Sequence, residues 1–154
     1  MNDSGKLPKV IVIGPGGGHL SEAMLATEGV PMNRIVATYC EPHTRASMSG
    51  EQLRCLIDPH GSLWKYALNA MQALWILLRE RPRAIVSTGG GMSIATCLLG
   101  KLLGAKLIYV ESGARVSSPS RTGKLLYRHA DLFIVQWESM LEHFPKAVYG
   151  GMLF

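Results

Sequence analysis

The stretch KVIVIGPGGGHLSEAML, residues 9–25, sets the architecture of this chain. Its first five residues form a β-branched apolar run that predicts a buried strand. The glycines of GPGGG predict a turn directly after that strand. The residues from His19 to Thr27 then favour a helix, which Gly29 and Pro31 bring to an end.

The rest of the chain repeats this alternation. Further strands are predicted over residues 34–39, 52–57, 84–88, 106–110, 131–136 and 146–149. Helices are predicted over residues 62–79, 93–103, 124–129 and 137–144, with an irregular polar segment over 40–51. Such alternation predicts an α/β fold, a Rossmann-like doubly wound parallel sheet with right-handed crossovers and the default strand order 3-2-1-4-5-6.

Ligands of such sheets bind outside the carboxyl ends of the strands. We therefore expect the site in the loops that follow the strands, at residues 14–19, 40–44, 88–93, 111–122 and 136–138. The 154 residues suffice for one domain, residues 1–154, and leave no room for a second. Residues 1–8 are expected to be a flexible N-terminus, and the tail of residues 150–154 is expected to dock on a partner.

Charge and cysteine content bear on the binding partners and on the cellular compartment of the protein. The net charge of +5 suits phosphates, nucleic acid or an acidic membrane face, and equally an ordinary soluble protein. Cys40, Cys55 and Cys97 are odd in number and lack metal-type spacing, which favours a reducing cytosolic compartment, with Cys97 as a buried thiol.

The sequence predicts no transmembrane span. The N-terminus is polar and has no signal-peptide core. The longest uncharged apolar stretch, Tyr66–Leu78, is shorter than the roughly 20 residues that cross a bilayer. Attachment to a membrane surface stays open.

Two glycine loops flank the expected switch point of the sheet. The first, Gly14 to His19, contains Gly16, Gly17 and Gly18, and His19 stands where the dinucleotide fingerprint needs its third glycine. The second contains Gly89, Gly90 and Gly91. Glycine lets the backbone approach an anion at a helix N-terminus, so the pair would cradle a diphosphate or a sugar. The alternative is close packing of strand against helix.

Two titratable residues are candidates for catalysis. His19 opens the first helix, where it would act as a general base or would only shape the loop. Glu22 lies one turn on, and either orients His19 or faces solvent. Glu111 follows the strand over 106–110 directly, a position suited to catalysis, ribose binding or an ion pair with Arg115.

A basic series follows Glu111. Its members would contact phosphate or form a solvated basic face: Arg115, Arg121, Lys124 and Arg128. The helix over 62–81 carries the apolar residues Leu63, Trp64, Ala67, Met71, Leu74, Trp75 and Leu78, with basic residues at its margins. Tryptophans with cationic flanks can mark an interfacial helix, but we expect this face to pack on the sheet.

Three stretches carry a family resemblance: GGGHLSE, TGGG and above all ESGARVSSPSRTGKLLYRHADLFIVQW, residues 111–137. With the ending PKAVYGGMLF, they resemble PssD/CpsF-type polysaccharide glycosyltransferase subunits. These belong with the membrane-anchoring subunit of the eukaryotic two-subunit N-acetylglucosaminyltransferase of the dolichol pathway. The resemblance covers nearly the whole chain, and the glycine loops alone are shared with MurG and other GT-B enzymes.

The resemblance implies the N-terminal, acceptor-side half of a GT-B glycosyltransferase. The donor half would be a separate subunit, and the acceptor would be a polyprenyl-diphosphate-linked sugar. The chain looks like the bacterial form without an N-terminal span, cytoplasmic and peripheral at the cytoplasmic face of the membrane. The signature stretch adds Ser112, Arg115, Ser120, Gly123 and Lys124 to the expected substrate-binding residues.

Three functions compete at this point. The first is a heteromeric transferase subunit for exopolysaccharide, capsule or lipid-linked oligosaccharide, which takes a sugar from a nucleoside diphosphate with His19 or Glu111 assisting. The second is a non-catalytic accessory that recruits or activates the transferase. The third is a nucleotide-binding module with Glu41 on a ribose. The sequence suggests no metal, no cofactor and no nucleic-acid partner.

Overall fold

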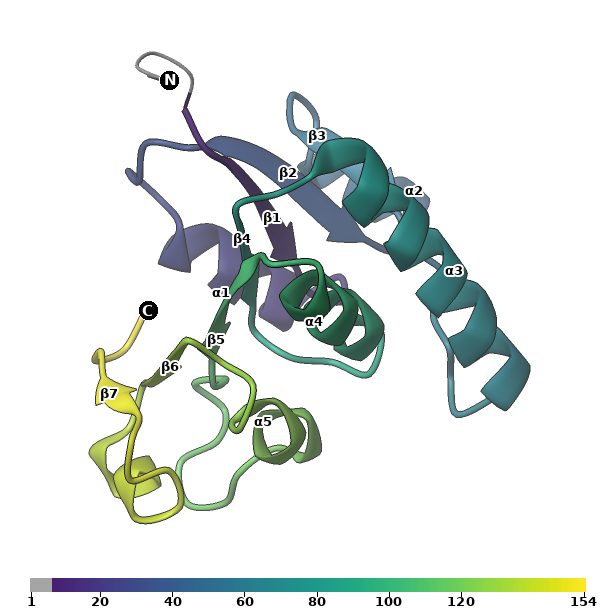
Figure 1. The fold of residues 1–154 in the computed structure, drawn as a ribbon. Coiled ribbons are helices and arrows are strands. Elements are labelled where there is room, and N and C mark those ends of the chain that lie inside the picture. The colour runs from purple at the N-terminus through teal and green to yellow at the C-terminus, as the bar shows by residue number, and fades with distance from the viewer. Residues whose placement is uncertain (1–6) are drawn as a thin grey trace, which may run out of the picture.

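Strand β1, Lys9–Ile13, lies inside the sheet, with β2 (Asn33–Thr38) on one side and β4 (Ala84–Ser87) on the other. The computed structural model describes residues 7–154 (Figure 1), so residues 1–6 of the expected N-terminal segment lie outside it. The remaining strands are β3 (Gln52–Cys55), β5 (Lys106–Val110), β6 (Leu132–Val135) and β7 (Val148–Tyr149). All pairings are parallel in the order β3-β2-β1-β4-β5-β6-β7, which confirms the predicted order and adds β7.

Helices cover both faces of the sheet, because alternate residues of β1 point to opposite sides. Val10 and Val12 pack with Ala23 of α1 (Gly18–Ala26). Ile11 and Ile13 belong to the larger core, to which α3 (Leu63–Glu80) and α4 (Ser93–Leu102) contribute. The other helices are short: α2 (Pro42–Ser47), α5 (Arg121–Leu126) and the 3₁₀ turn η1 (Glu138–Glu142).

Helix α2 was not predicted, α5 begins and ends earlier than predicted, and the helix predicted over 137–144 is the 3₁₀ turn η1. Residues 42–47 form α2 where an irregular segment was expected; Pro42 suits a first helical turn, and six residues show no apolar period. Helix α5 begins at Arg121 rather than Lys124. The Ser120 hydroxyl accepts from the Gly123 backbone N–H at 2.8 Å and caps that first turn.

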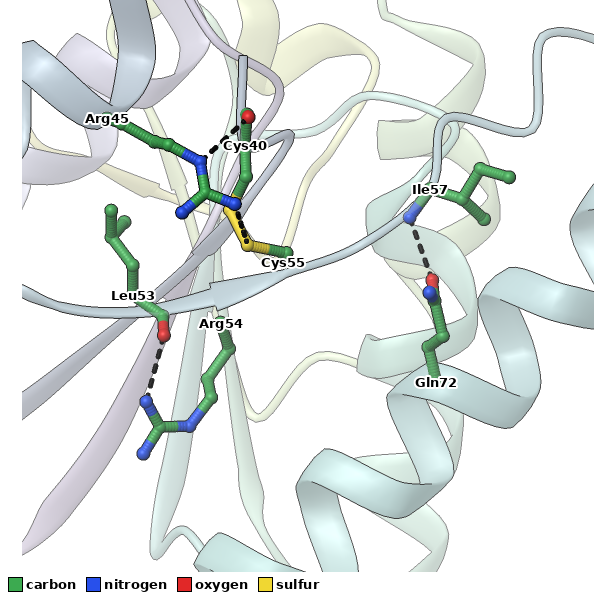
Figure 2. The surroundings of a disulfide bond; sticks show 7 residues. All are labelled: Cys40, Arg45, Leu53, Arg54, Cys55, Ile57 and Gln72. Carbon is green, nitrogen blue, oxygen red and sulfur yellow. Dashed lines mark hydrogen bonds between the residues drawn. A yellow bond between two sulfur atoms is a disulfide. The ribbon is translucent and has the colours of Figure 1, made fainter. Parts of the chain in front are cut away.

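A disulfide joins Cys40 to Cys55 (Figure 2), a pairing that the number and spacing of the cysteines did not predict. Strands β2 and β3 are parallel neighbours, so the chain just after β2 lies beside the end of β3. The Arg45 guanidinium donates to the Cys40 carbonyl at 3.1 Å and lies 3.5 Å from Cys55 Sγ. Cys97 is the free, buried thiol that was predicted, and burial raises its pKa to about 12.

Helix α3 packs on the sheet with the opposite side from the one predicted. Its buried residues are Asn69, Ala73, Ile76, Leu77 and Glu80. The side chains expected to form the core face are instead exposed: Leu63, Trp64, Ala67, Met71, Leu74, Trp75 and Leu78. The prediction was wrong because the inner polar groups find partners. Asn69 donates to the Ile57 carbonyl at 2.9 Å, and Glu80 is bonded by Arg54 at 2.6 Å. Over residues 7–154 no helix has both the length and the apolar character that crossing a membrane requires.

Candidate functional site

The two glycine loops touch each other across the carboxyl ends of β1 and β4. A Cβ at Gly90 would lie 2.6 Å from Pro15 Cδ, and Gly90 has a φ of +86°, so only glycine fits this contact. A Cβ at Gly91 would lie 3.1 Å from the hydroxyl of Tyr66, in the first turn of α3. The predicted pairing of the loops at the switch point therefore has a physical basis in direct packing.

His19 and Thr88 join these loops by two hydrogen bonds. The His19 ring Nδ1 lies 3.0 Å from the Thr88 carbonyl oxygen, and the Thr88 hydroxyl donates to the His19 carbonyl at 2.6 Å. Because a carbonyl oxygen only accepts, Nδ1 carries the proton in the neutral ring and Nε2 carries the lone pair. The His19 side chain is 39% exposed, so this imidazole is open to a ligand.

Glu22 is buried and holds the loop after β5, so it does not face solvent. Its Oε1 accepts from the Gly113 N–H at 2.8 Å and from the Ser112 hydroxyl at 3.2 Å. Its Oε2 lies 4.0 Å from His19 Nδ1 and has no hydrogen-bond partner within the described part of the chain. Glu22 thus connects the histidine helix to the signature loop.

Glu111 lies beneath that loop, only 1% exposed. Its Oε2 accepts from the Ser120 hydroxyl at 3.1 Å, and its Oε1 accepts from the Ser112 N–H at 3.3 Å. Burial raises the pKa of this carboxyl, and the hydrogen bonds from Ser120 and Ser112 oppose the rise. A Cβ at Gly123 would overlap Glu111 Oε2. In this arrangement Glu111 positions the loop, and its predicted catalytic role stays a prediction.

Two further residues hold the loop after β5, and neither was identified from the sequence: Gln136 and Trp137, which follow β6. The Trp137 indole donates to the Gly113 carbonyl at 2.7 Å, and the Gln136 amide donates to the Glu111 carbonyl at 3.1 Å. The amide oxygen of Gln136 also accepts from the Leu153 N–H at 3.1 Å. Both residues lie in the loop 136–138, which the strand-end rule already singled out.

The remaining predicted residues lie in the first glycine loop, in the loop after β5, and in or just after α5. Gly17 is the N-cap of α1 with a φ of +93°, and a Cβ at Gly16 would lie 3.0 Å from the Thr44 hydroxyl. Ser120 serves as the cap of α5. The basic side chains of Arg115, Arg121, Lys124 and Arg128 are all exposed, and α5 contains Arg121 and Lys124 but ends before Arg128.

The arrangement can bind and activate an oxygen nucleophile beside an anion. The amino end of α1 supplies backbone donors and a positive dipole, and the two glycine loops give close access. The Nε2 lone pair of His19 can accept a hydroxyl proton. Over residues 7–154 no three side chains of His, Cys, Asp or Glu gather as metal ligands.

A family model described as "Oligosaccharide biosynthesis protein Alg14 like" matches residues 59–153. The UDP-N-acetylglucosamine transferase subunit ALG14 of Homo sapiens is 27% identical over 177 residues, covering 94% of this chain and 82% of the human protein. The same-named subunit of Candida albicans is 41% identical over 83 residues, 50% of this chain and 38% of that protein.

Solved structures with this fold are longer chains. The MurG of Acinetobacter baumannii has a TM-score of 0.70 at 15% identity, covering 86% of this chain and 42% of that chain. The UDP-N-acetylglucosamine 2-epimerase of Rickettsia bellii has a TM-score of 0.73 at 14% identity, covering 90% of this chain and 41% of that chain. The chain therefore spans about four-tenths of each of these two solved chains. At such identities the likeness concerns the fold alone, and it confirms the α/β Rossmann-like class.

Proposed function

The chain belongs to the Alg14-like family of oligosaccharide biosynthesis proteins, and on this premise we propose that it is the acceptor-side subunit of a two-component glycosyltransferase. The pair would transfer N-acetylglucosamine or a related sugar from a uridine diphosphate donor to a polyprenyl-diphosphate-linked acceptor. The names of the human and Candida relatives support the donor class and the subunit role. The donor-binding half would be a separate polypeptide, and the 150–154 tail is the segment we expect to dock on it.

The observation that carries the proposal is the His19–Thr88 pair between two glycine loops. Within it His19 presents an unprotonated Nε2 beside an anion-binding helix terminus. We assign the general base to His19, because His19 is partly exposed whereas Glu111 is buried. Nε2 would take the proton of the acceptor hydroxyl as that oxygen bonds to the anomeric carbon, while the bond from that carbon to the nucleoside diphosphate breaks and the diphosphate leaves.

An accessory role is the second candidate, and the geometry around Glu111 favours it. Most of the signature residues, including Ser112, Ser120 and Gly123, hold one another in place around this buried carboxyl. Such a framework would present a docking surface even if the partner supplied all catalytic groups. In either case we place the chain at the cytoplasmic face of a membrane, where a lipid-linked acceptor resides.

Reconstitution tests the proposal. Sugar transfer from labelled UDP-N-acetylglucosamine to a polyprenyl-diphosphate-linked sugar is measured with this chain, its donor-side partner and the pair. Transfer only by the pair supports the two-component enzyme. Equal transfer by the partner alone would contradict it and leave this chain an accessory at most.

A further inference from the structure

The outward side of α3 is a continuous apolar surface, which we call the α3 apolar face. It consists of Leu63, Trp64, Ala67, Leu68, Met71, Leu74, Trp75 and Leu78, all exposed. Leu63 is 87% exposed, Met71 67% and Trp75 58%. In Figure 1 the helix lies at the margin of the molecule with α4 on its inner side. A run of large apolar side chains on the solvent side of a helix marks an interaction surface.

This face is not explained by the packing of the helix. The side of α3 that meets the sheet carries Asn69 and Glu80 beside Ala73, Ile76 and Leu77. Water would solvate the two polar residues at no cost, whereas here they need buried partners. The apolar residues therefore do not serve the core of this chain.

Positive charge borders the α3 apolar face. The Lys65 ammonium lies 5.8 Å from the ring centre of Trp64, and the Arg79 guanidinium lies 5.1 Å from that of Trp75. Arg81 and Arg83, which directly follow the helix, are exposed. The one acidic residue of α3, Glu80, is buried and paired with Arg54 and Lys9. The face and its border thus carry cations without an exposed carboxylate on the helix.

The apolar surface extends past the end of α3. A groove of about 650 Å³ lies at the amino ends of the strands, and its walls include Leu77, Leu78, Leu103, Arg81 and Arg83. Leu103 is half exposed, and the neighbouring Leu102 is 82% exposed. Leucine and arginine side chains therefore both line this end of the surface. This combination suits the boundary between acyl chains and headgroups. There arginine and tryptophan bury the apolar part of the side chain while the polar tip stays in contact with water.

We propose that the α3 apolar face binds the surface of an anionic lipid bilayer. The helix would lie in the plane of the interface, with Trp64, Met71 and Trp75 among the acyl chains and Lys65, Arg79, Arg81 and Arg83 at the headgroups. Charge favours an anionic lipid surface as the occupant, because the face is bordered by Lys65, Arg79, Arg81 and Arg83 and α3 carries no exposed carboxylate. The inference goes beyond the transferase proposal, since it rests on exposure and charge and requires no activity.

Vesicle co-sedimentation of the full chain tests this proposal. We expect binding to vesicles of phosphatidylglycerol and phosphatidylcholine, weaker binding to phosphatidylcholine alone, and partial loss of binding in high salt. The double variant Met71→Gln, Trp75→Gln should bind the anionic vesicles at least about tenfold more weakly, because each side chain gives up the burial of a large apolar group. Brominated acyl chains should quench the tryptophan fluorescence of the unsubstituted chain.

Control variants show whether binding depends on the α3 apolar face itself or on the overall hydrophobicity and charge of the protein surface. Val30→Gln replaces an apolar residue that is 50% exposed in the turn before β2, and should leave binding unchanged. Arg79→Gln with Arg81→Gln should lower the binding to anionic vesicles, whereas Arg128→Gln should have a smaller effect. Urea unfolding should show that every variant is folded, since all these side chains are exposed.

Two results would overturn the proposal. One is the absence of binding to either kind of vesicle. The other is equal vesicle binding by the Met71→Gln, Trp75→Gln variant and the unsubstituted chain; if that variant also failed to form the complex with the donor-side subunit, the face would be a protein interface. Neither of these depends on sugar transfer, so a failure of the transferase proposal would be recognised separately.

Discussion

Thr88 and His19 hold each other by two hydrogen bonds that run in opposite directions. The ring of His19 donates to the Thr88 carbonyl at 3.0 Å, and the Thr88 hydroxyl donates to the His19 carbonyl at 2.6 Å. The first bond selects the tautomer and the second fixes the backbone on which the ring is mounted. Both residues come from glycine loops that are 69 positions apart in the chain. The geometry of the site therefore depends on a pair that no local sequence pattern joins.

Replacing Thr88 by valine should destabilise the fold. The substitution keeps the shape but removes the donor to the His19 carbonyl, at an expected loss of about 1–3 kcal/mol in the free energy of unfolding. Urea unfolding measures this. Thr38→Val is the matched control, because Thr38 is also fully buried and its hydroxyl has no partner among the described residues. Equal losses in the two variants would contradict a specific role for the Thr88 hydroxyl.

Replacing His19 by glutamine should slow sugar transfer by the reconstituted pair by about 10²–10⁴-fold. The glutamine amide can still donate to the Thr88 carbonyl, but it cannot accept a proton. Single-turnover transfer measures the chemical step, and co-purification verifies that the complex persists. His143→Gln, at an exposed ring that contacts the Ser117 carbonyl at 3.1 Å, should leave the rate unchanged. Full activity of the His19 variant would assign catalysis to the partner.

Alanine at Gly123 should be costly, because its Cβ would overlap the Glu111 carboxylate and lie 2.9 Å from Ser120 Oγ. We expect a loss of about 2 kcal/mol or more in the free energy of unfolding, since these buried groups cannot move aside without breaking their hydrogen bonds. Gly18→Ala is the control, since a Cβ there meets nothing within 4 Å. Thermal unfolding compares the two, and a tolerant Gly123 would argue against close packing on Glu111.

Reduction of the Cys40–Cys55 disulfide should lower the free energy of unfolding by about 3 kcal/mol, given the 15-residue separation that it closes. Alkylation in denaturant, followed by mass spectrometry, should modify one cysteine before reduction and three after it. The double variant Cys40→Ser, Cys55→Ser should unfold identically with and without reductant. Three modified cysteines in protein that was never reduced would show that the bond is not formed.

Asp131 should contribute stability that is lost in acid. Hydrogen bonds from Lys101 and the Leu107 N–H lower its pKa from 3.8 to about 2. A carboxyl whose pKa is depressed by folding stabilises the fold above its unfolded pKa, and this contribution disappears as pH falls from about 4 to about 2. Asp131→Asn should therefore be less stable at pH 7, by about 1 kcal/mol after screening at this partly exposed site. Urea unfolding should show the difference vanish near pH 2.

The fold was largely predictable from the sequence, because the alternation of β-branched runs with helical segments reports on backbone periodicity. The orientation of α3 was not. The amphipathic pattern of α3 shows that one side is apolar, but it does not show whether that side faces the sheet or the exterior. The partners that allow Asn69 and Glu80 to be buried are distant in the sequence and were therefore not foreseen. The disulfide was likewise hidden, since Cys40 and Cys55 become neighbours through the pairing of β2 with β3.

The sequence predicted which loops form the candidate site, but it predicted less well what each residue in them does. Residue type and position identified His19 and Glu111, because strand ends carry ligands in parallel sheets. Their partners were missed, since Thr88, Gln136 and Trp137 act through contacts with residues far away in the chain. The site roles assigned to Arg115 and Lys124 stay predictions.

The Tyr66 hydroxyl lies so close to Gly91 that a Cβ there would be 3.1 Å away. The first turn of α3 is therefore next to the second glycine loop. With α3 in the lipid interface, as proposed, its apolar side would sink by roughly 5–10 Å and the second glycine loop would lie near the headgroups of the bilayer. The diphosphate of a lipid-linked acceptor could then reach this loop while its lipid stays in the bilayer. Only the sugar attached to the diphosphate would need to extend to His19.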